Sequence, residues 1–438
     1  MNLLIENIRG ISYALVSPTL SLMLIVIAII FYFKNRKIAF MQKLMLGRSI
    51  QSPLEMTLLQ ILIGILGGLI ASLLLSILGV TFENSSLIDV ILTVSVFSVL
   101  YKNRFLKFPY IASLLGVIGV LVSKNTEYFG RGFSFSINLT SIIVLIGVFS
   151  IVEGILAMID GDKGYLPIFT QKDGKLVGGF GFKRFWALPL CLLVVLGANS
   201  GNSIINEVKD LPQWLPFFNG DKARALMSVA ALGTLAAYGA TSYEGTTFTQ
   251  SKRCKTITSG LINIAYGIVV IILAYLLKES LVFTIALIIL IPLLYELRIR
   301  MELKLESLRE PLYFSNDDEI CILDVLPNSI AYKKGLRSGD KIVKINEEIP
   351  KNEKEVFMAI KRNFYGLDLE IRKNNGNIEK HTITGEDRGK QFGIVLVPKG
   401  ISFDKEIDEF LEKLKKASKD EEVKNKEGLT WLYLRFTY

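Results

Sequence analysis

The chain has 438 residues, 51% of them hydrophobic, and it carries a net charge of +9 with a pI of about 9.2. A soluble protein of this length is normally less apolar and more charged. Its Lys and Arg residues stand in short clusters between apolar runs, and no basic face carries interleaved aromatic residues. This pattern favours a membrane protein with basic cytoplasmic loops and argues against a nucleic-acid-binding protein.

The first two thirds of the chain, residues 1–297, predict a polytopic α-helical membrane domain, because a bilayer core needs about 20 apolar residues as a helix. The first run is too long for the apolar part of a signal peptide, and KNRK follows it where a cleavage site would stand, so we expect it to remain as an anchor. About nine spans are predicted: 11–33, 57–80, 86–101, 108–123, 137–159, 185–205, 223–240, 261–278 and 281–297.

Basic residues predict the orientation of these spans. Clusters of Lys and Arg follow the first, third, fifth and seventh spans, and such clusters mark cytoplasmic loops. The N-terminus is therefore expected outside the cell, and everything after about Arg298 is expected in the cytoplasm.

Glu153 is a candidate for an intramembrane functional residue, because an ionisable side chain inside a span is costly and usually has a role. A second reading is open. Glu153 stands near the cytoplasmic end of its span, within about two helical turns of Asp160, where it can reach the interface or pair with a loop lysine.

Catalytic chemistry finds little support in this sequence. The single histidine, His381, lies outside the spans, which excludes the HExxH zinc site of a membrane metalloprotease. The three cysteines (191, 254 and 321) have no metal-ligand spacing, and no lysine lies in a span to form a Ser–Lys dyad. We expect no catalytic residue, no metal and no cofactor.

After the last span, residues 298–311 predict a charged helical linker. A small α+β domain is then predicted from alternating strands and short helices with Gly and Asn at the turns. Its predicted elements are strand 319–327, helix 327–335, strand 335–348, helix 352–364, hairpin 367–385 and strand 392–398.

The order of these elements, with the pattern P-x-S-x-A followed by GL-x-x-GD-x-I-x-x-I-N, resembles a PDZ domain of the bacterial type over about residues 312–400. The resemblance implies a cytoplasmic module that binds a peptide by adding it as a strand to a sheet edge. The residues that carry the motif are Pro327, Ser329, Ala331, Gly335, Leu336, Gly339, Asp340, Ile342, Ile345 and Asn346.

In such a domain the peptide groove is expected between strand 319–325 and helix 353–363. The preceding loop carries three successive acids, Asp317 to Glu319, which would repel a terminal carboxylate and favour an internal segment as the ligand. Residues 401–438 predict an amphipathic helix and an aromatic tail that either packs on the module or touches the membrane surface. The expected groove residues are Glu319, Ile320, Cys321, Ile322, Val356 and Ile360.

The whole arrangement is similar to the MinJ-like family of polytopic division-site adaptors of Firmicutes. The similarity includes GGLIASLLLSILGVTF (67–82), GFKRFWALPL (181–190) and the terminal PDZ-like module. It implies a non-enzymatic scaffold in the cell membrane, enriched at septa or poles, that binds DivIVA-like and MinD-like cytoplasmic proteins. Two alternatives remain: a transporter or channel with a PDZ anchor, and an adaptor that presents substrates to a membrane protease.

Overall fold

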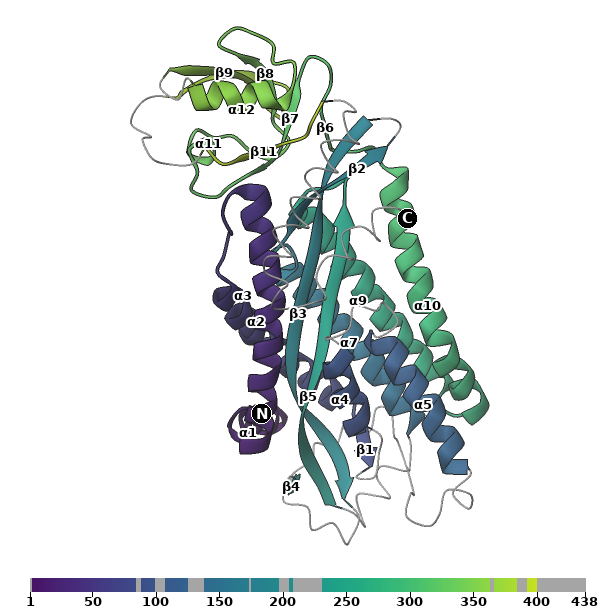
Figure 1. Ribbon diagram of the computed structural model, residues 1–438. Coiled ribbons are helices and arrows are strands. Elements are labelled where there is room, and N and C mark those ends of the chain that lie inside the picture. The colour runs from purple at the N-terminus through teal and green to yellow at the C-terminus, as the bar shows by residue number, and fades with distance from the viewer. Residues whose placement is uncertain are drawn as a thin grey trace, which may run out of the picture.

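The structure of the chain is a computed structural model. It describes residues 2–83, 88–98, 107–124, 138–172, 175–196, 205–207, 231–362, 366–383 and 392–399. Residues 2–311 are called the membrane half, and residues 312–399 are called the module. Figure 1 shows the module lying at one end of the elongated membrane half.

Within its described residues, the membrane half contains five helices that are long and apolar enough to cross a bilayer, which identifies a multi-pass membrane protein. Two further apolar helices, α4 and α5, are shorter, and α1 precedes the first long helix. The helices are α1 (Asn2–Val16), α2 (Pro18–Leu46), α3 (Pro53–Ile77), α4 (Ile88–Ser98), α5 (Phe108–Lys124), α7 (Leu139–Asp160), α9 (Lys252–Leu277) and α10 (Leu281–Leu308).

Local sequence signals set the ends of these helices. Helix α2 ends at Gly47, whose φ of 80° suits a residue without Cβ. Helix α3 begins with a capping box, in which Ser52 and Glu55 each accept a hydrogen bond from the other's backbone N–H, and Pro53 occupies the first helical position. At the start of α9, the side chain of Ser251 accepts a hydrogen bond from the backbone N–H of Cys254.

The prediction of nine helical spans is wrong, because the part of the chain that the structure describes has five long apolar helices. The predicted first span is divided between α1 and α2 near Ser17, and the predicted third and fourth spans are the short helices α4 and α5. The described parts of the predicted sixth and seventh spans, 185–196 and 231–240, fall on two strands, β3 (Lys175–Leu196) and β5 (Ala231–Thr247), and the rest of these two spans lies almost entirely outside the described residues.

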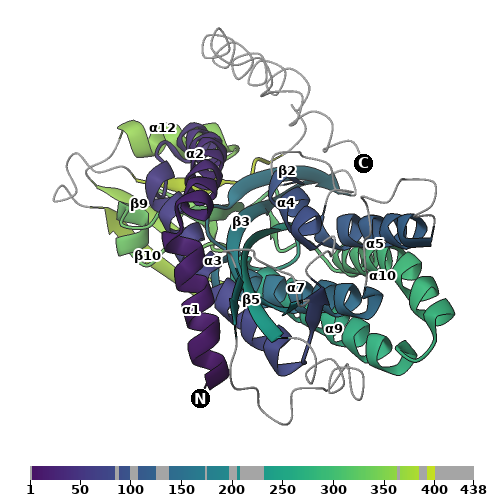
Figure 2. The ribbon, with the colours of Figure 1, turned by 90° about the horizontal axis from the view of Figure 1, so that it is seen from below.

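These two strands form a long antiparallel ribbon inside the helical layer. Seventeen residue pairs join them, from Phe180–Thr247 to Leu196–Ala231, which is about 55 Å of paired strand. In Figure 2 the ribbon lies between α1 and α2 on one side and α7 and α9 on the other. Side chains of one face, such as Phe185 and Tyr238, pack on α1 and α2, while the alternate side chains, such as Trp186, pack in the cluster around α7.

The outer edges of the ribbon are also covered. Short strands pair with its two ends, and between them α3 lies directly on β3, where a Cβ at Gly64 would stand 2.1 Å from the carbonyl oxygen of Ala187. The backbone N–H of Cys191 donates to Ser72 Oγ at 2.9 Å, and that of Ala240 donates to Ser95 Oγ at 3.2 Å. Helix serines thus provide acceptors to edge groups that lipid would leave unpaired. The short strands are β1 (Thr81–Glu83), β2 (Leu166–Lys172), β4 (Ile205–Glu207) and β6 (Tyr313–Phe314).

The module is a five-stranded antiparallel sheet with two helices, in the order β10-β9-β8-β7-β11. A turn at Asn375 and Gly376, where Gly376 has a φ of 86°, joins β9 to β10, as the hairpin prediction placed it. Its elements are β7 (Ile320–Val325), α11 (Ile330–Lys333), β8 (Lys341–Ile345), α12 (Glu353–Arg362), β9 (Leu367–Arg372), β10 (Ile378–Ile383) and β11 (Ile394–Leu396).

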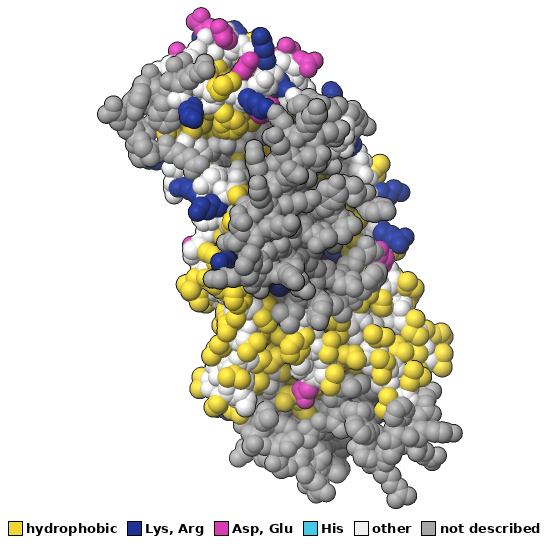
Figure 3. All heavy atoms as spheres, in the orientation of Figure 1, with side chains coloured by type: hydrophobic (Ala, Val, Ile, Leu, Met, Phe, Trp, Pro, Cys, Tyr) yellow, Lys and Arg dark blue, Asp and Glu magenta, His cyan; other side chains and the backbone are white. Residues whose placement is uncertain are grey.

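The surface divides into an apolar band and a polar end. In Figure 3 the hydrophobic side chains form a band over the part of the membrane half distant from the module, and Lys and Arg gather between that band and the module. Helix α10 continues without a break to Leu308, so the predicted separate linker is the continuation of the last long helix. The predicted amphipathic helix and tail at 401–438 lie outside the described residues.

Candidate functional site

Strand β7, the expected peptide-binding strand, has neighbours on both edges. It pairs with β8 through Ile320 and Cys321 and with β11 through Ile322 to Val325. Ile320, Cys321 and Ile322 are each fully buried. Because both edges of β7 carry a partner, an added strand has no place there, and the residues expected to line a groove are core residues.

The neighbouring strand β11 lies at the border of the sheet. Among the described residues it pairs only with β7. The carbonyl of Gly393 accepts from the N–H of Leu326 at 2.9 Å, so in an antiparallel ladder the N–H and C=O of the next residue, Ile394, face the other edge. Gly393 has a φ of 74°, and a Cβ there would stand 2.5 Å from Cβ of Ser329, so this strand start requires glycine.

The inner face of helix α12 belongs to the same core as this strand. Val356 and Ile360 join the module core together with Ile394 and Leu396. Phe357, the residue after Val356, is 47% exposed. The ammonium of Lys399, just after β11, donates to the carbonyl of Pro350 at 2.8 Å, which places the end of β11 near the start of α12.

The residues of the predicted motif adopt backbone roles that explain their identity. Ser329 caps α11, its Oγ accepting from the N–H of Tyr332 at 3.2 Å, and Ala331 is fully buried. Gly335 and Gly339 have φ of 82° and 95°, in the region that favours glycine. Pro327 belongs to the same turn region, where its carbonyl accepts from Arg48 of the loop after α2.

Two polar residues of the motif hold the turns closed. Asp340 is buried, and its Oδ2 accepts from the N–H of Arg337 at 2.8 Å and from Lys373 at 3.1 Å. Asn346, with a φ of 47°, exchanges backbone and side-chain hydrogen bonds with Asp368 at 2.9 and 3.0 Å. These contacts fix the loops on either side of β8.

The acidic loop before β7 is partly neutralised. Glu319 is buried, with Oε1 2.7 Å from Arg372 and Oε2 3.5 Å from Lys341. The carbonyl of Asp317 accepts from Lys399 at 2.6 Å. Burial lowers the pKa of Lys399, and the neighbouring acids, Asp318 and Asp317 first, oppose that effect. This loop therefore lies against the end of β11.

The module shares a core with the membrane half. Side chains of β7 alternate, with Ile320 and Ile322 in the module core and Cys321 and Leu323 in the larger cluster that includes Tyr165 and Phe180. On and beside β11, Val395 and Val397 belong to that larger cluster too. Burying one such side chain contributes about 1.5–3 kcal/mol, so the four together far outweigh a single hydrogen bond of about 1 kcal/mol.

Polar contacts orient this docking. Tyr165 Oη, after α7, donates to Asp324 Oδ2 of β7 at 2.5 Å, and Lys252 at the start of α9 lies 2.8 Å from Asp324 Oδ1. The ammonium of Lys252 also stands 3.8 Å from the centre of the Tyr165 ring. Burial, and then the Asp324 charge, raise the pKa of Tyr165 far above its ordinary value, so the hydroxyl keeps its proton for this bond.

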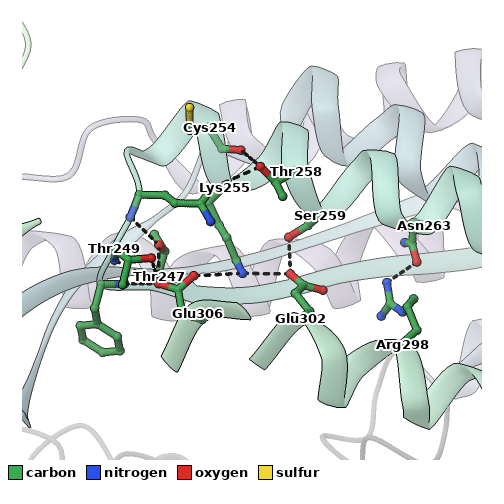
Figure 4. Close-up of polar contacts among 12 residues, drawn as sticks. Thr247, Thr249, Cys254, Lys255, Thr258, Ser259, Asn263, Arg298, Glu302 and Glu306 are labelled. Atoms are coloured by element: carbon green, nitrogen blue, oxygen red, sulfur yellow. Dashed lines mark hydrogen bonds and ion pairs between the residues drawn. The ribbon is translucent and has the colours of Figure 1, made fainter. Parts of the chain in front are cut away.

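A polar seam joins the last two long helices below the module (Figure 4). Lys255 of α9 lies 3.0 Å from Glu302 Oε1 and 3.5 Å from Glu306 Oε2 of α10. Glu306 Oε1 also accepts from the backbone N–H groups of Phe248 and Thr249 at 2.8 and 3.0 Å. These bonds hold the end of α10 on the loop that follows β5.

Glu153 lies at the far end of the same seam. Its Oε2 accepts from Thr241 Oγ1 of β5 at 2.7 Å, and its Oε1 accepts from Asn263 Nδ2 of α9 at 2.9 Å. Arg298 donates to the carbonyl oxygen of that same Asn263 side chain. Both carboxylate oxygens are thus bonded between three elements, with Thr241 and Asn263 as the hydrogen-bond partners. The charge of Glu153 also interacts with that of Lys107, a residue of a predicted basic loop, which agrees with the loop-lysine reading of the sequence.

A second buried charge, Asp160, stands about two turns of α7 further on. Asp160 Oδ2 accepts from Arg184 Nε at 2.8 Å, from Arg184 Nη2 at 2.5 Å and from Trp186 Nε1 at 3.1 Å. Asp160 and Arg184 are both fully buried. In the sequence, Arg184 belongs to a cluster of basic residues that predicts a loop. The structure instead places it on strand β3 of the ribbon.

Sequence reasoning did not recognise that β11 lies at the border of the sheet, although FGIVLVP was identified as a strand. The signal was the glycine at its start, flanked by Phe392 and Ile394. For metals, no group of three or more His, Cys, Asp and Glu side chains placed to hold an ion occurs in the described part of the chain.

Comparison with known proteins gives one informative similarity. The chain is 23% identical over 355 residues to the cell division topological determinant MinJ of Bacillus subtilis (strain 168), covering 76% of this chain and 81% of that protein. Because 76% of the chain is more than residues 1–311 contain, the similar region extends into the module. No family model matches the chain, and no solved structure matches it.

Proposed function

We propose that this protein is a non-enzymatic membrane adaptor of division-site selection, and that its module is a cytoplasmic PDZ domain of the bacterial type. The observation that carries the proposal is the distant similarity to a topological determinant of cell division, which extends over both the membrane half and part of the module. DivIVA-like and MinD-like proteins are the proposed cytoplasmic partners.

The arrangement of charges supports the proposed orientation. Lys and Arg collect on the module side of the apolar band, as they do on the cytoplasmic side of membrane proteins. The module is then cytoplasmic, where division proteins assemble, and the N-terminal end of α2 lies on the opposite side.

The proposed ligand is a peptide segment that adds to the free edge of β11. Backbone N–H and C=O groups of Ile394 face that edge, and such groups bind an extended chain by continuing the sheet. The proposed groove therefore lies one strand away from the expected site at β7. It is on the side where β11 ends near the start of α12.

Localisation of a fluorescent fusion in cells tests the adaptor role. A first comparison sets the full chain beside a truncation ending near Arg309. That truncation also removes side chains from the core shared with the membrane half. A second comparison, between two single substitutions, is therefore needed. Ile394→Pro removes the outward N–H but no β7 ladder bond, whereas Ile394→Ala removes the same core side chain and keeps the N–H.

Enrichment at septa or poles is expected for the full chain and for Ile394→Ala, and uniform membrane fluorescence is expected for Ile394→Pro. Uniform fluorescence of the full chain would reject the division role. Equal enrichment of the two substituted chains would reject strand addition at β11.

A further inference from the structure

Helix α12 presents an apolar face that is unusual for a cytoplasmic surface. Phe357 and Met358 are 47% and 48% exposed, and exposed Lys354 and Lys361 flank them at helical spacing. The opposite face, with Val356 and Ile360, is buried in the module core. Adjacent exposed aromatic and thioether side chains rimmed by cations indicate a contact surface.

The described chain ends close to the start of α12. The ammonium of Lys399 donates to the carbonyls of Pro350 and Asp317, and α12 begins three residues after Pro350, at Glu353. The next residues of the chain therefore start from the N-terminal end of α12. A spacer of three residues, 400–402, reaches about 10 Å, enough to bring the following segment alongside the helix.

That following segment, FDKEIDEFLEKL at 403–414, has the complementary chemistry. Its apolar residues recur at helical spacing and share one face, and acids outnumber bases among its polar residues. The apolar residues are Phe403, Ile407, Phe410, Leu411 and Leu414, and the acids are Asp404, Glu406, Asp408, Glu409 and Glu412.

We propose that residues 403–414 dock as a helix on the outer face of α12, with their apolar side chains on Phe357 and Met358 and their acids beside Lys354 and Lys361. The lengths agree: twelve helical residues span about 18 Å, and the ten residues of α12 span about 15 Å. The docking itself does not depend on the division role.

A fluorescent probe on α12 tests this contact in the full chain. Cys254 is the exposed cysteine, and Cys191 and Cys321 are buried, so Cys254→Ser gives a background for one added thiol. Bimane is attached at Met358→Cys, and in a second chain at Lys361→Cys, in phosphatidylcholine nanodiscs. Quenching by acrylamide is compared between the full chain and a chain ending at Gly400.

Removal of the segment is expected to raise the quenching constant several-fold at both positions. The triple change Asp404→Lys, Asp408→Lys and Glu412→Lys is expected to raise it as well, because it reverses the charge that faces the lysines. Bimane at Ile378→Cys, on an exposed residue of β10, is the control and should not respond to either change.

Equal quenching of the full and shortened chains would overturn the proposal. Protection that persists without the segment but disappears on dilution would assign the face to a second copy of the chain, which also overturns it. Since the readout involves no division protein, it remains informative if localisation shows no enrichment at septa.

Discussion

Tyr165 of the membrane half donates a hydrogen bond to Asp324 of the module at 2.5 Å, across a boundary that separates them by 159 residues in sequence. Lys252 completes the contact on the other carboxylate oxygen. The module is thus seated in a defined orientation on the membrane half, with its β7 and β11 side chains in a shared core. A peptide bound at β11 would therefore be held at a fixed position relative to the bilayer.

The first prediction uses the native cysteines to report whether the module is docked on the membrane half. Burial raises the pKa of the Cys321 thiol to about 12, whereas Cys254 is exposed. Thiolate is the reactive form, so at pH 8 roughly one Cys321 in ten thousand is ionised. We expect one thiol per chain to react with Ellman's reagent in the folded protein and three after denaturation. Rapid reaction of a second thiol that Cys321→Ser removes would contradict a closed interface.

The second prediction concerns the Tyr165 contact. Tyr165→Phe removes the bond to Asp324 and leaves Lys252 in place, so we expect docking to weaken by about 1–2 kcal/mol. In a Cys254→Ser chain, that change should increase the alkylation rate of Cys321 about tenfold. Tyr332→Phe is the matched control, because the half-exposed Tyr332 lies on α11 of the module, away from this contact. An unchanged Cys321 rate in Tyr165→Phe would show that the apolar contacts alone set the docking.

The third prediction concerns the buried pair of Asp160 and Arg184. Arg184→Leu removes the buried partner of Asp160 and leaves the partly exposed Lys163, 3.5 Å from Asp160 Oδ1, as a weaker countercharge. We therefore expect it to lower the free energy of unfolding by about 3 kcal/mol, the low end for a broken buried pair. The double change Asp160→Leu with Arg184→Leu should cost less than Arg184→Leu alone, because no charge remains buried. Thermal unfolding in detergent, followed by circular dichroism, measures both. A double variant less stable than the single one would indicate that the pair itself contributes net stability.

Much of the module could be predicted from sequence, because its turns need particular residues. Gly335, Gly339 and the Asn375–Gly376 turn stand at positive φ or in tight turns, where few residue types fit. The strand pairing could not be predicted in the same way. Both β7 and β11 are buried on two faces, so neither shows the polar alternation that distinguishes an edge strand from a central one.

The ribbon was mistaken for two helical spans for the same physical reason. Its strands are buried on both faces, so residues 185–196 are apolar throughout, as in a membrane helix. The distinction lies in partners far away in sequence. The runs 67–82 and 181–190, which suggested the family resemblance, meet in the structure, with Gly68 against Pro189. One sequence cannot reveal such a contact.

The fourth prediction tests the packing of α3 on β3 at a neighbouring glycine, Gly64. A Cβ at Gly64 would lie 2.1 Å from the backbone oxygen of Ala187, which cannot move without disturbing the ribbon, whereas a Cβ at Gly116 would meet only the flexible end of Ile288. Alanine favours the helix at both sites by about 1 kcal/mol. We expect Gly64→Ala to destabilise the protein by about 3 kcal/mol and Gly116→Ala to be nearly neutral. Equal midpoints of thermal unfolding for the two variants would argue against direct packing of α3 on β3.

The fifth prediction separates an adaptor from a transporter at Glu153. Its carboxylate accepts hydrogen bonds from Thr241 and Asn263, an arrangement that suits a structural link between α7, β5 and α9. Glu153→Gln keeps the shape and loses one acceptor, at a cost of about 1 kcal/mol. We expect its septal fluorescence to match that of the full chain, while Ile394→Pro loses enrichment. The reverse result, with Glu153→Gln inactive in cells and Ile394→Pro active, would favour transport, because a carboxylate that must ionise within a membrane pathway cannot be replaced by an amide.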